Sequence, residues 1–257
     1  MYVTPEEAVK SMIQAAEKKS TLPLGKMIIR GFLSGAILGY ATSLSFVPRI
    51  QGLPAFVGAV IFPVGFVILV LMGLELVTGN FALLPMGLMA KRVNTVNLAR
   101  NWFWVYVANL LGGVTYAYLY VVTIANHDPK VIEILNSISK SKIVFYQQAG
   151  IEGIVIATLK GILCNWMVTA ATAMAFFSTT TTGKALTMWL PIMAFFALGY
   201  EHSVVNMFVL PAAIMVNSEG ATLQSWWIWN QIPVTVGNIL GAILFTSIPL
   251  MSHYKKE

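Results

Sequence analysis

The sequence predicts an all-α membrane protein with six spans, arranged as an inverted 3+3 repeat. Three observations support this fold class. Of 257 residues, 57% are hydrophobic and 10% are charged, whereas soluble domains carry about 25% charged residues. Apolar runs long enough to cross a bilayer recur along the chain. Residues 75–89 also resemble residues 201–215, which indicates a duplicated unit.

Matched segments carry the internal repeat. ELVTGNFALLPMGLM at 75–89 and EHSVVNMFVLPAAIM at 201–215 share five identities over fifteen ungapped positions, at an offset of 126. Two further pairs keep nearly the same offset: Arg30-Gly31 with Lys160-Gly161, and residues 108–112 with 237–241. Three ordered matches at a nearly constant offset favour duplication over chance.

A short amphipathic helix is expected over residues 1–22. Thr4 is a typical N-cap, Pro5 suits the first helical position and Glu6 lies in the first turn. Four apolar residues then fall on one face: Ala8, Met12, Ile13 and Ala16. The charged start does not resemble a cleavable signal peptide. We expect this helix to lie on the membrane surface or against the transmembrane bundle.

Six helical spans should follow, two of them broken. Their approximate ranges are 24–46, 56–89, 98–124, 151–177, 186–216 and 226–250. The second and fifth are longer than an ordinary crossing requires. Polar residues interrupt each of these two, around Glu75 and around Glu201, so a break is expected at both places. Repeat one would then cover residues 23–124 and repeat two residues 149–250.

The basic residues predict the orientation. An even number of spans puts both termini on one side, and placing them inside leaves four outer basic residues: Arg49, Lys130, Lys140 and Lys142. The eleven inner ones are Lys10, Lys18, Lys19, Lys26, Arg30, Lys91, Arg92, Arg100, Lys184, Lys255 and Lys256. This bias favours a multi-pass cell-membrane protein with cytoplasmic termini. Inverted repeats bring the two breaks together near the midplane, where such folds place their binding or permeation site.

His202 is the only histidine within a predicted span. Imidazole titrates near neutrality. An anion in an apolar slit meets a desolvation barrier of several kcal/mol, whereas its protonated acid crosses more easily. We therefore expect His202 to protonate or polarise a permeant anion. Alternatively, His202 is a structural residue of the core whose side chain is hydrogen-bonded to the backbone.

Glu75 and Glu201 occupy equivalent positions of the two repeats. A carboxylate in an anion pore would repel the permeant ion, so both are expected to be structural and to accept hydrogen bonds from the freed backbone N–H groups. Asparagines near the breaks either donate to an anion or join helices. We place Asn206 at the pore, and Asn80 and Asn238 at the breaks as structural residues.

The stretches GYEHSVVNMF, KGILCNWMV and ELVTGN are similar to signature stretches of the formate/nitrite transporter family, and the resemblance covers about residues 4–249. It implies a homopentamer in the lipid bilayer whose protomers are aquaporin-like and each have a pore for small monovalent anions. It also implies that Thr78 and Asn165 line or support the pore beside His202. The residues that it implies at apolar constrictions are Phe62, Phe66, Leu76 and Phe195.

One position departs from the family pattern. The family usually has a lysine sixteen residues before the asparagine of the CNW motif, and this chain has Ala149 there. Lys142 and Lys160 are the two candidates for attracting anions in its place. Lys160 has a second interpretation, in which it snorkels or pairs with Glu152.

Other classes of function fit less well. An enzyme is not expected, because no nucleophile constellation and no second histidine for a metal accompany His202. Neither cofactor nor nucleic acid is expected, and the single Cys164 excludes a disulfide within the chain. A water or glycerol channel would carry Asn-Pro-Ala turns at both breaks. A proton-coupled secondary carrier stays open. Formate is the preferred anion and nitrite the next, with hydrosulfide, lactate and bicarbonate as alternatives.

Overall fold

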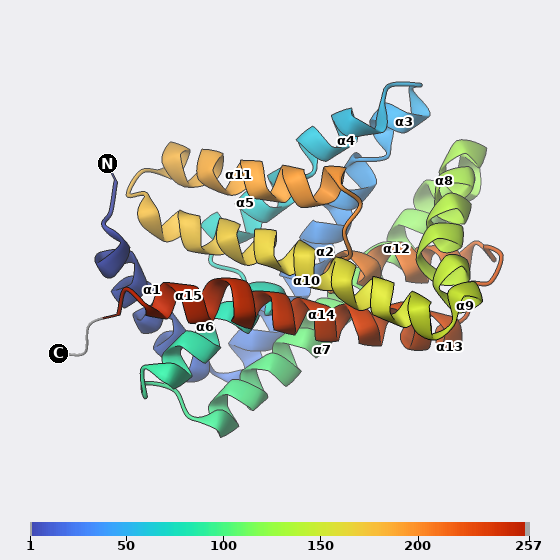
Figure 1. Cartoon of the computed structure of the whole chain (residues 1–257). Coiled ribbons are helices and arrows are strands. Elements are labelled where there is room, and N and C mark those ends of the chain that lie inside the picture. Colours follow the sequence, from blue (N-terminus) through green and yellow to red (C-terminus); the bar gives the residue numbers. More distant parts are fainter. Residues whose placement is uncertain (1, 255–257) are drawn as a thin grey trace.

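The computed structural model describes residues 2–254, and apart from one isolated pairing between Tyr2 and Ser178 its regular structure is helical (Figure 1). The predicted inner residues Lys255 and Lys256 lie outside the described range. The helices are α1 Pro5–Ser20, α2 Leu24–Leu44, α3 Val47–Ile50, α4 Ala55–Ile61, α5 Pro63–Leu71, α6 Val77–Met89, α7 Thr95–Thr123, η1 Ala125–His127, α8 Pro129–Ser139, η2 Lys140–Val144, α9 Phe145–Ala149, α10 Ile151–Met174, η3 Ala175–Phe177, α11 Thr181–Ala197, α12 Ser203–Met215, α13 Leu223–Trp226, η4 Trp227–Gln231, α14 Ile232–Ala242, η5 Ile243–Ser247 and α15 Ile248–Met251.

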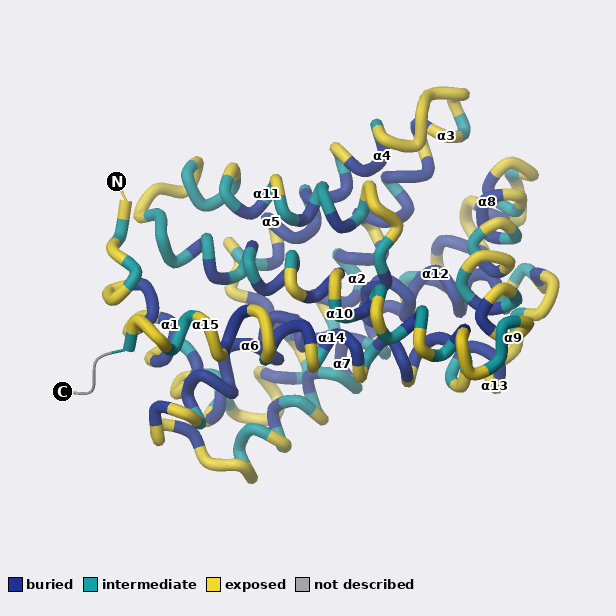
Figure 2. Tube along the Cα trace, viewed as in Figure 1, coloured by how far each residue is buried: buried dark blue, intermediate teal, exposed yellow. Residues whose placement is uncertain are grey.

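Within the described residues, four helical stretches are long and apolar enough to cross a membrane: Leu24–Ile50, Thr95–His127, Ile151–Phe177 and Leu223–Met251. Three shorter apolar stretches accompany them: Ala55–Leu71, Val77–Met89 and Ser203–Met215. The shorter helices α6 and α12 are buried along almost their whole length, whereas the long helices have exposed outer faces (Figure 2). The molecule is therefore a helical bundle whose centre is formed by α6 and α12.

The chain leaves helical structure at residues 72–76, before α6, and at residues 198–202, before α12. Both preceding helices end at a glycine with positive φ, Gly73 at 65° and Gly199 at 66°. Glycine suits this conformation because it has no Cβ. The next amide donates back to a carbonyl five residues earlier in both cases: Leu74 to Leu69, and Tyr200 to Phe195. Both helices thus end in a Schellman arrangement.

Two helix pairs pack at backbone distance, α2 against α7 and α10 against α14. A Cβ added at Gly112 would collide with the carbonyl oxygen of Phe32, and one at Gly241 with the carbonyl oxygen of Ile162. Small residues permit this approach. In both pairs it brings an asparagine, Asn109 or Asn238, to the carbonyl of a facing glycine and to the non-helical segment beside it.

The N-terminal helix α1 packs against the bundle, which is the second of its two expected placements. Thr4 Oγ1 accepts the Glu7 N–H at 3.4 Å, and the Glu7 carboxylate accepts the Thr4 N–H at 3.3 Å, which is a capping box. Met12 and Ile13 are buried in one cluster with residues of α6. The last turn of α1 brings Lys19 to the segment before α6.

Residues 125–149 form a helical cap at the end of the bundle opposite to both chain ends (Figure 1). The main helix of this cap is α8, Pro129–Ser139. Two other helices begin earlier than the hydrophobic runs indicated. Asn94 caps α7 and Thr180 caps α11 through side-chain oxygens, because these residues satisfy the free amides of a first turn.

Candidate functional site

A hydrogen bond between the N-terminal ends of α6 and α12 marks the centre of the candidate site. His202 is the N-cap of α12, and its Nε2 lies 3.0 Å from Oγ1 of Thr78 in the first turn of α6. Nδ1 of His202 accepts the N–H of Val205 at 3.2 Å. Because Nδ1 is an acceptor, the neutral imidazole carries its proton on Nε2 and donates it to Thr78. The hydroxyl proton of Thr78 then remains for another acceptor.

Helices α6 and α12 both begin at this centre. Leu76 caps α6 with φ −108° and ψ 119°, and His202 caps α12 with φ −111° and ψ 118°. The partial positive charge at a helix N-terminus favours a nearby anion. The centre therefore combines two helix N-termini with one imidazole and one hydroxyl group.

Apolar side chains enclose the polar centre. The Phe195 ring lies 5.8 Å from the imidazole of His202 and 5.8 Å from the ring of Phe62, measured between centroids. Phe62 also stacks on Phe196 at 3.9 Å. The four residues expected at constrictions, Phe62, Phe66, Leu76 and Phe195, are at most 4% exposed. These four apolar residues, here called the apolar shell, accompany the polar pair of His202 and Thr78.

Asn165 on α10 joins the two halves of the centre. Its Nδ2 donates to the backbone oxygen of Thr78 at 3.1 Å and to that of Asn238 at 2.6 Å. Both partners are acceptors, so the orientation of the amide is determined. Its buried Oδ1 has no partner among the described residues. An amide oxygen only accepts hydrogen bonds, so this atom suits water or a protonated acid, but not a bare anion.

Four residues form a closed hydrogen-bonded circuit beside the first non-helical segment, here called the Lys19 ring. Lys19 Nζ lies 2.9 Å from both carboxylate oxygens of Glu75. Asn80 donates from Nδ2 to Glu75 and to Asn101, at 2.9 Å each. Asn101 donates to the backbone oxygen of Lys19 at 3.0 Å, which closes the ring.

The second segment has a ring of the same connectivity, the Lys142 ring. Lys142 Nζ lies 2.6 Å from Oε2 of Glu201. Asn206 donates to Glu201 at 2.8 Å and to Asn230 at 2.7 Å, and Asn230 donates to the backbone oxygen of Lys142 at 3.0 Å. The Tyr146 hydroxyl adds a bond to Glu201 at 2.8 Å. Both carboxylates are thus neutralised and fully engaged.

The partners of these carboxylates differ from those expected. We expected Glu75 and Glu201 to accept backbone N–H groups, and they accept lysine and asparagine side chains instead. The backbone N–H groups of Val77 and Ser203 donate to Asn109 and Asn238 at 2.9 Å. These two asparagines are in turn donors to the carbonyls of Glu75 and Glu201, also at 2.9 Å. Asn109 and Asn238 extend to the breaks from the neighbouring helices α7 and α14, whereas the two carboxylates bond to lysine and asparagine side chains.

The two lysines considered for anion attraction have different surroundings. Lys142 is committed to Glu201 in the Lys142 ring. The ammonium of Lys160 lies 5.9 Å from the ring centroid of Tyr146, within range of a cation–π interaction. It lines an open cavity of about 690 Å³ with Lys140 at the end that carries α8. No ion pair joins Lys160 to Glu152 in the part of the chain that the structure describes.

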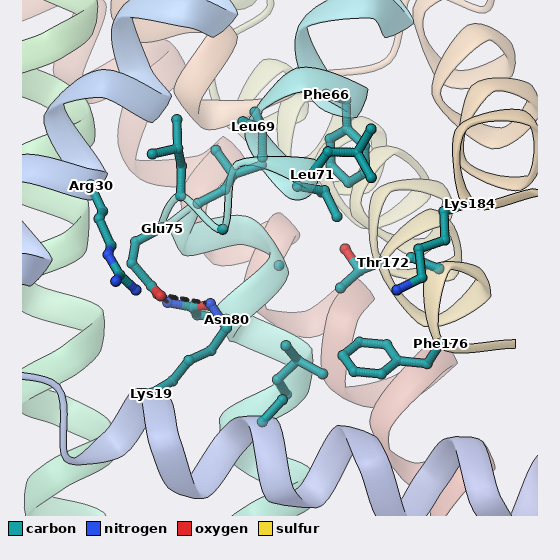
Figure 3. Close-up of a pocket in the computed structure, with 18 of the residues that line it drawn as sticks. Lys19, Arg30, Phe66, Leu69, Leu71, Glu75, Asn80, Thr172, Phe176 and Lys184 are labelled. Carbon is teal, nitrogen blue, oxygen red and sulfur yellow. Dashed lines mark hydrogen bonds and ion pairs between the residues drawn. The ribbon is translucent and has the colours of Figure 1, made fainter. Parts of the chain in front are cut away.

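A second cavity, of about 410 Å³, extends from α1 to the apolar shell at Phe66 and Leu76 (Figure 3). Four basic residues line it: Lys18, Lys19, Arg30 and Lys184. Sequence reasoning assigned these residues to one side of the membrane but not to a common cavity. It also missed Asn101 and Asn230, although their spacing of 129 repeats that of Asn109 and Asn238.

This combination of fold and site defines a multi-pass helical membrane transport protein. Within residues 2–254 no three His, Cys, Asp or Glu side chains gather as a metal site requires. The chain belongs to the formate/nitrite transporter family, whose sequence profile matches residues 6–252. Similar proteins with a named activity, found by sequence and by structure, are transporters or channels, not enzymes.

Individual relatives match over nearly their full length. A probable formate transporter of Methanothermobacter thermautotrophicus is 35% identical, over 100% of this chain and 98% of the relative. A formate channel of Bacillus thuringiensis is 30% identical, over 98% and 96%. Among solved structures, an FNT family ion channel superposes with a TM-score of 0.81 at 24% identity, over 96% of this chain and 99% of that one. A pentameric formate channel with formate bound gives a TM-score of 0.76 at 24% identity, over 88% and 95%.

Proposed function

We propose that the protein conducts small monovalent anions through the cell membrane together with a proton, formate first and nitrite next. Membership of the formate/nitrite transporter family supports the class, and relatives named as formate transporter and formate channel support formate. The observation that carries the proposal is the hydrogen bond between His202 and Thr78, buried inside an apolar shell between two helix N-termini.

The anion approaches a slit bounded by Phe62, Phe66, Leu76 and Phe195. Removing its hydration there is costly unless its charge is reduced or paired with donors. The Thr78 hydroxyl donates to an anion oxygen while His202 Nε2–H polarises that hydroxyl. His202 keeps its own proton, since Nδ1 is held by the Val205 N–H. Solvent supplies the transported proton, and the orphaned Asn165 Oδ1 accepts a hydrogen bond from the protonated acid or from water beside it.

The architecture that we propose is six spans in two inverted repeats, residues 23–124 and 149–250, with residues 1–22 as a separate amphipathic helix. The second and fifth spans are broken at residues 72–76 and 198–202. The equal connectivity of the Lys19 and Lys142 rings supports the repeat. The common end of both chain termini supports an even number of spans (Figure 1). We place both termini in the cytoplasm because this orientation puts eleven basic residues on the inner side and four on the outer side.

We propose a homopentamer as the assembly, with one pore in each protomer. A solved neighbour whose fold superposes on nearly this whole chain is described as pentameric. The long helices α2, α7, α10 and α14 all carry exposed large apolar residues on their outer faces, which suits both lipid and subunit contact. Glu75, Glu201, Asn80 and Asn238 are structural residues in this proposal, and Lys160 is the outer attracting cation.

The test is anion uptake into proteoliposomes across pH 5 to 8, with formate, nitrite and hydrosulfide in parallel. We expect the formate flux to rise as pH falls. We expect His202→Ala to lower this flux at least tenfold, because the variant lacks a hydrogen-bond donor that stabilises charge. Thr78→Val should lower flux similarly, whereas Thr123→Val, on an exposed turn of α7, should not.

Equal flux in wild type and His202→Ala would remove His202 from the mechanism. Absence of flux for every monoanion would contradict the proposed function. Saturable flux that requires a proton gradient would instead identify a proton-coupled carrier in the same fold, and preferred uptake of hydrosulfide, lactate or bicarbonate would change the assigned anion.

A further inference from the structure

The π-helical turn η5 brings two hydroxyl groups into the bundle. A π turn holds more residues than an α turn, and such turns are often found at functional sites. Thr246 and Ser247 lie in this turn and are 3% and 0% exposed. They follow Gly241 and Ala242 by five residues, and Ser247 Oγ lies 3.2 Å from the Ala242 carbonyl oxygen. The wider turn therefore continues the face of α14 that packs on α10.

A regular α-helix would bring a different side chain to this face. Residues four apart share one face of an α-helix, so Phe245 would follow Gly241 toward α10. In the structure Phe245 is 42% exposed and stacks on Trp166, with 4.7 Å between the ring centroids. The π turn thus keeps a large ring outside and places two small polar side chains inside.

The two hydroxyl groups bond to α10 and α6, beside which η5 lies (Figure 1). Thr246 Oγ1 lies 2.7 Å from Oγ1 of Thr169 on α10. Thr169 donates its own proton to the backbone oxygen of Asn165 at 2.6 Å, so Thr246 is the donor to Thr169. Ser247 donates to the backbone oxygen of Ala82 on α6 at 2.9 Å. One turn of helix therefore connects α10 to α6.

These contacts lie one helical turn beyond the contact between Asn165 and Thr78. Thr169 follows Asn165 by four residues, and Ala82 follows Thr78 by four residues. Asn165 Nδ2 donates to the backbone oxygen of Thr78 at 3.1 Å. Contacts that hold both helices one turn away fix the height of α10 relative to α6, and this height sets the length of the bond between Asn165 and Thr78.

The first repeat fills the equivalent place with an aromatic ring. The offset between α2 and α10 is 130 residues, from position 30 to position 160, and it relates Gly39 to Thr169. The same offset relates Tyr116 to Thr246, in a part of α7 that is regular α-helix. A Cβ at Gly39 would lie 2.8 Å from the Tyr116 ring, so a ring contact replaces the pair of hydroxyl groups. The counterpart of Asn165, at position 35, is a glycine. The amide and the hydroxyl contacts thus occur together in the second repeat.

We propose that Thr169, Thr246 and Ser247, here called the η5 clamp, are positioning residues for transport. They hold Asn165 at bonding distance from Thr78, whose hydroxyl group belongs to the polar centre. The clamp acts through Asn165 and not by contact with the permeant ion. The inference rests on the proposed function, because it concerns how the same centre is held in place.

The first test is the initial rate of formate uptake into proteoliposomes. Thr246→Val/Ser247→Ala removes both hydroxyl groups of η5 with little change in volume. We expect this double variant to lower the rate about tenfold, since small displacements of positioned groups are costly. Thr246→Ser keeps a hydroxyl group and should retain most of the rate. Thr158→Val is the matched control, because Thr158 donates to Ile154 within its own helix α10.

The same measurement in an Asn165→Ala background tests whether the clamp acts through Asn165. Thr246→Val/Ser247→Ala should lower the remaining rate less than about twofold there, because the bond that the clamp positions is already lost. A full tenfold loss in this background would overturn the clamp. So would an unchanged rate in the otherwise wild-type protein, or a Thr246→Ser variant as slow as Thr246→Val. In each of these cases formate uptake by the wild type leaves the proposed function standing.

A second test does not depend on transport. Thermal unfolding in detergent measures the midpoints of Thr246→Val, Asn165→Ala and the variant that combines them. We expect the combined shift to be smaller than the sum of the single shifts, because the two side chains act in one hydrogen-bonded network. Thr158→Val combined with Asn165→Ala should be additive. Additive shifts in both pairs would overturn the clamp. This holds even if the wild type conducts no formate, which would contradict the proposed function separately.

Discussion

At the scale of single residues, the most constrained charges are the lysine–glutamate pairs of the two rings. Glu201 is 2% exposed and Lys142 19% exposed, and their contact is 2.6 Å long. Tyr146 and Asn206 satisfy further acceptor sites on the carboxylate. A buried ion pair of this kind contributes little net stability, but removing one partner leaves an uncompensated charge in the interior.

We therefore expect Lys142→Met to lower the stability of the protein by about 3 kcal/mol. Lys142→Met/Glu201→Gln should recover most of that loss, because both charges are gone. Lys140→Met is the control: its contact with Glu219 is 3.8 Å long between side chains that are 64% and 77% exposed, so it should cost under about 1 kcal/mol. Thermal unfolding in detergent measures all three. A loss in the double variant as large as in the single one would contradict the charge argument.

The sequence allowed some residues of these two rings to be predicted, but not the others. Glu75 and Asn80 were aligned with Glu201 and Asn206 because they lie inside one ungapped repeat. Asn101 and Asn230 lie on other helices, and their role depends on how those helices pack. Lys142 was assigned to the outer surface for the same reason: a loop position gives no indication that the side chain turns inward to a buried carboxylate.

At the scale of elements, close helix contacts position the asparagines that hold the non-helical segments. Asn109 on α7 and Asn238 on α14 each bond a backbone N–H and a carbonyl at one break. These bonds depend on glycines at the α2–α7 and α10–α14 contacts. The packing of the long helices and the geometry of the site are therefore coupled.

Gly112→Ala and Gly241→Ala should each destabilise the protein by about 1 to 3 kcal/mol, the usual cost of overpacking. The added methyl group meets a backbone carbonyl in both cases, and backbone yields less than a flexible side chain. Gly25→Ala is the matched control, since a Cβ there meets nothing within 4 Å. Shifts in the unfolding midpoint test this, and equal midpoints in all three variants would show that the helix pairs can separate freely.

The extents of the helices were predictable where hydrophobic runs coincide with them, as at Ile151–Phe177. Prediction was poorer where polar capping residues extend a helix beyond its apolar run. Asn94 and Thr180 move the starts of α7 and α11 outward in this way. The division at Phe62 and Pro63 was not predicted, although a proline at the first position of a helix is a known signal.

At the scale of the whole molecule, the cap of α8 and α9 and the two chain ends lie at opposite ends of the bundle (Figure 1). The proposed orientation puts the cap outside the cell. We expect Lys140→Cys to react with a membrane-impermeant thiol reagent added to intact cells. Arg92→Cys, in the exposed loop before α7, should react only after the cells are opened. The reverse pattern would invert the proposed topology, and labelling of both in intact cells would exclude it.

Leu76 and His202 are the N-cap residues of α6 and α12, and their backbone angles agree within a few degrees. An asparagine from a neighbouring helix bonds the first turn at both caps, but the imidazole is present at only one. The molecule has a nearly symmetric skeleton with a chemically one-sided centre. The proposed path therefore offers an ion from either face the same two groups, the His202 imidazole and the Thr78 hydroxyl, which come from opposite halves of the chain.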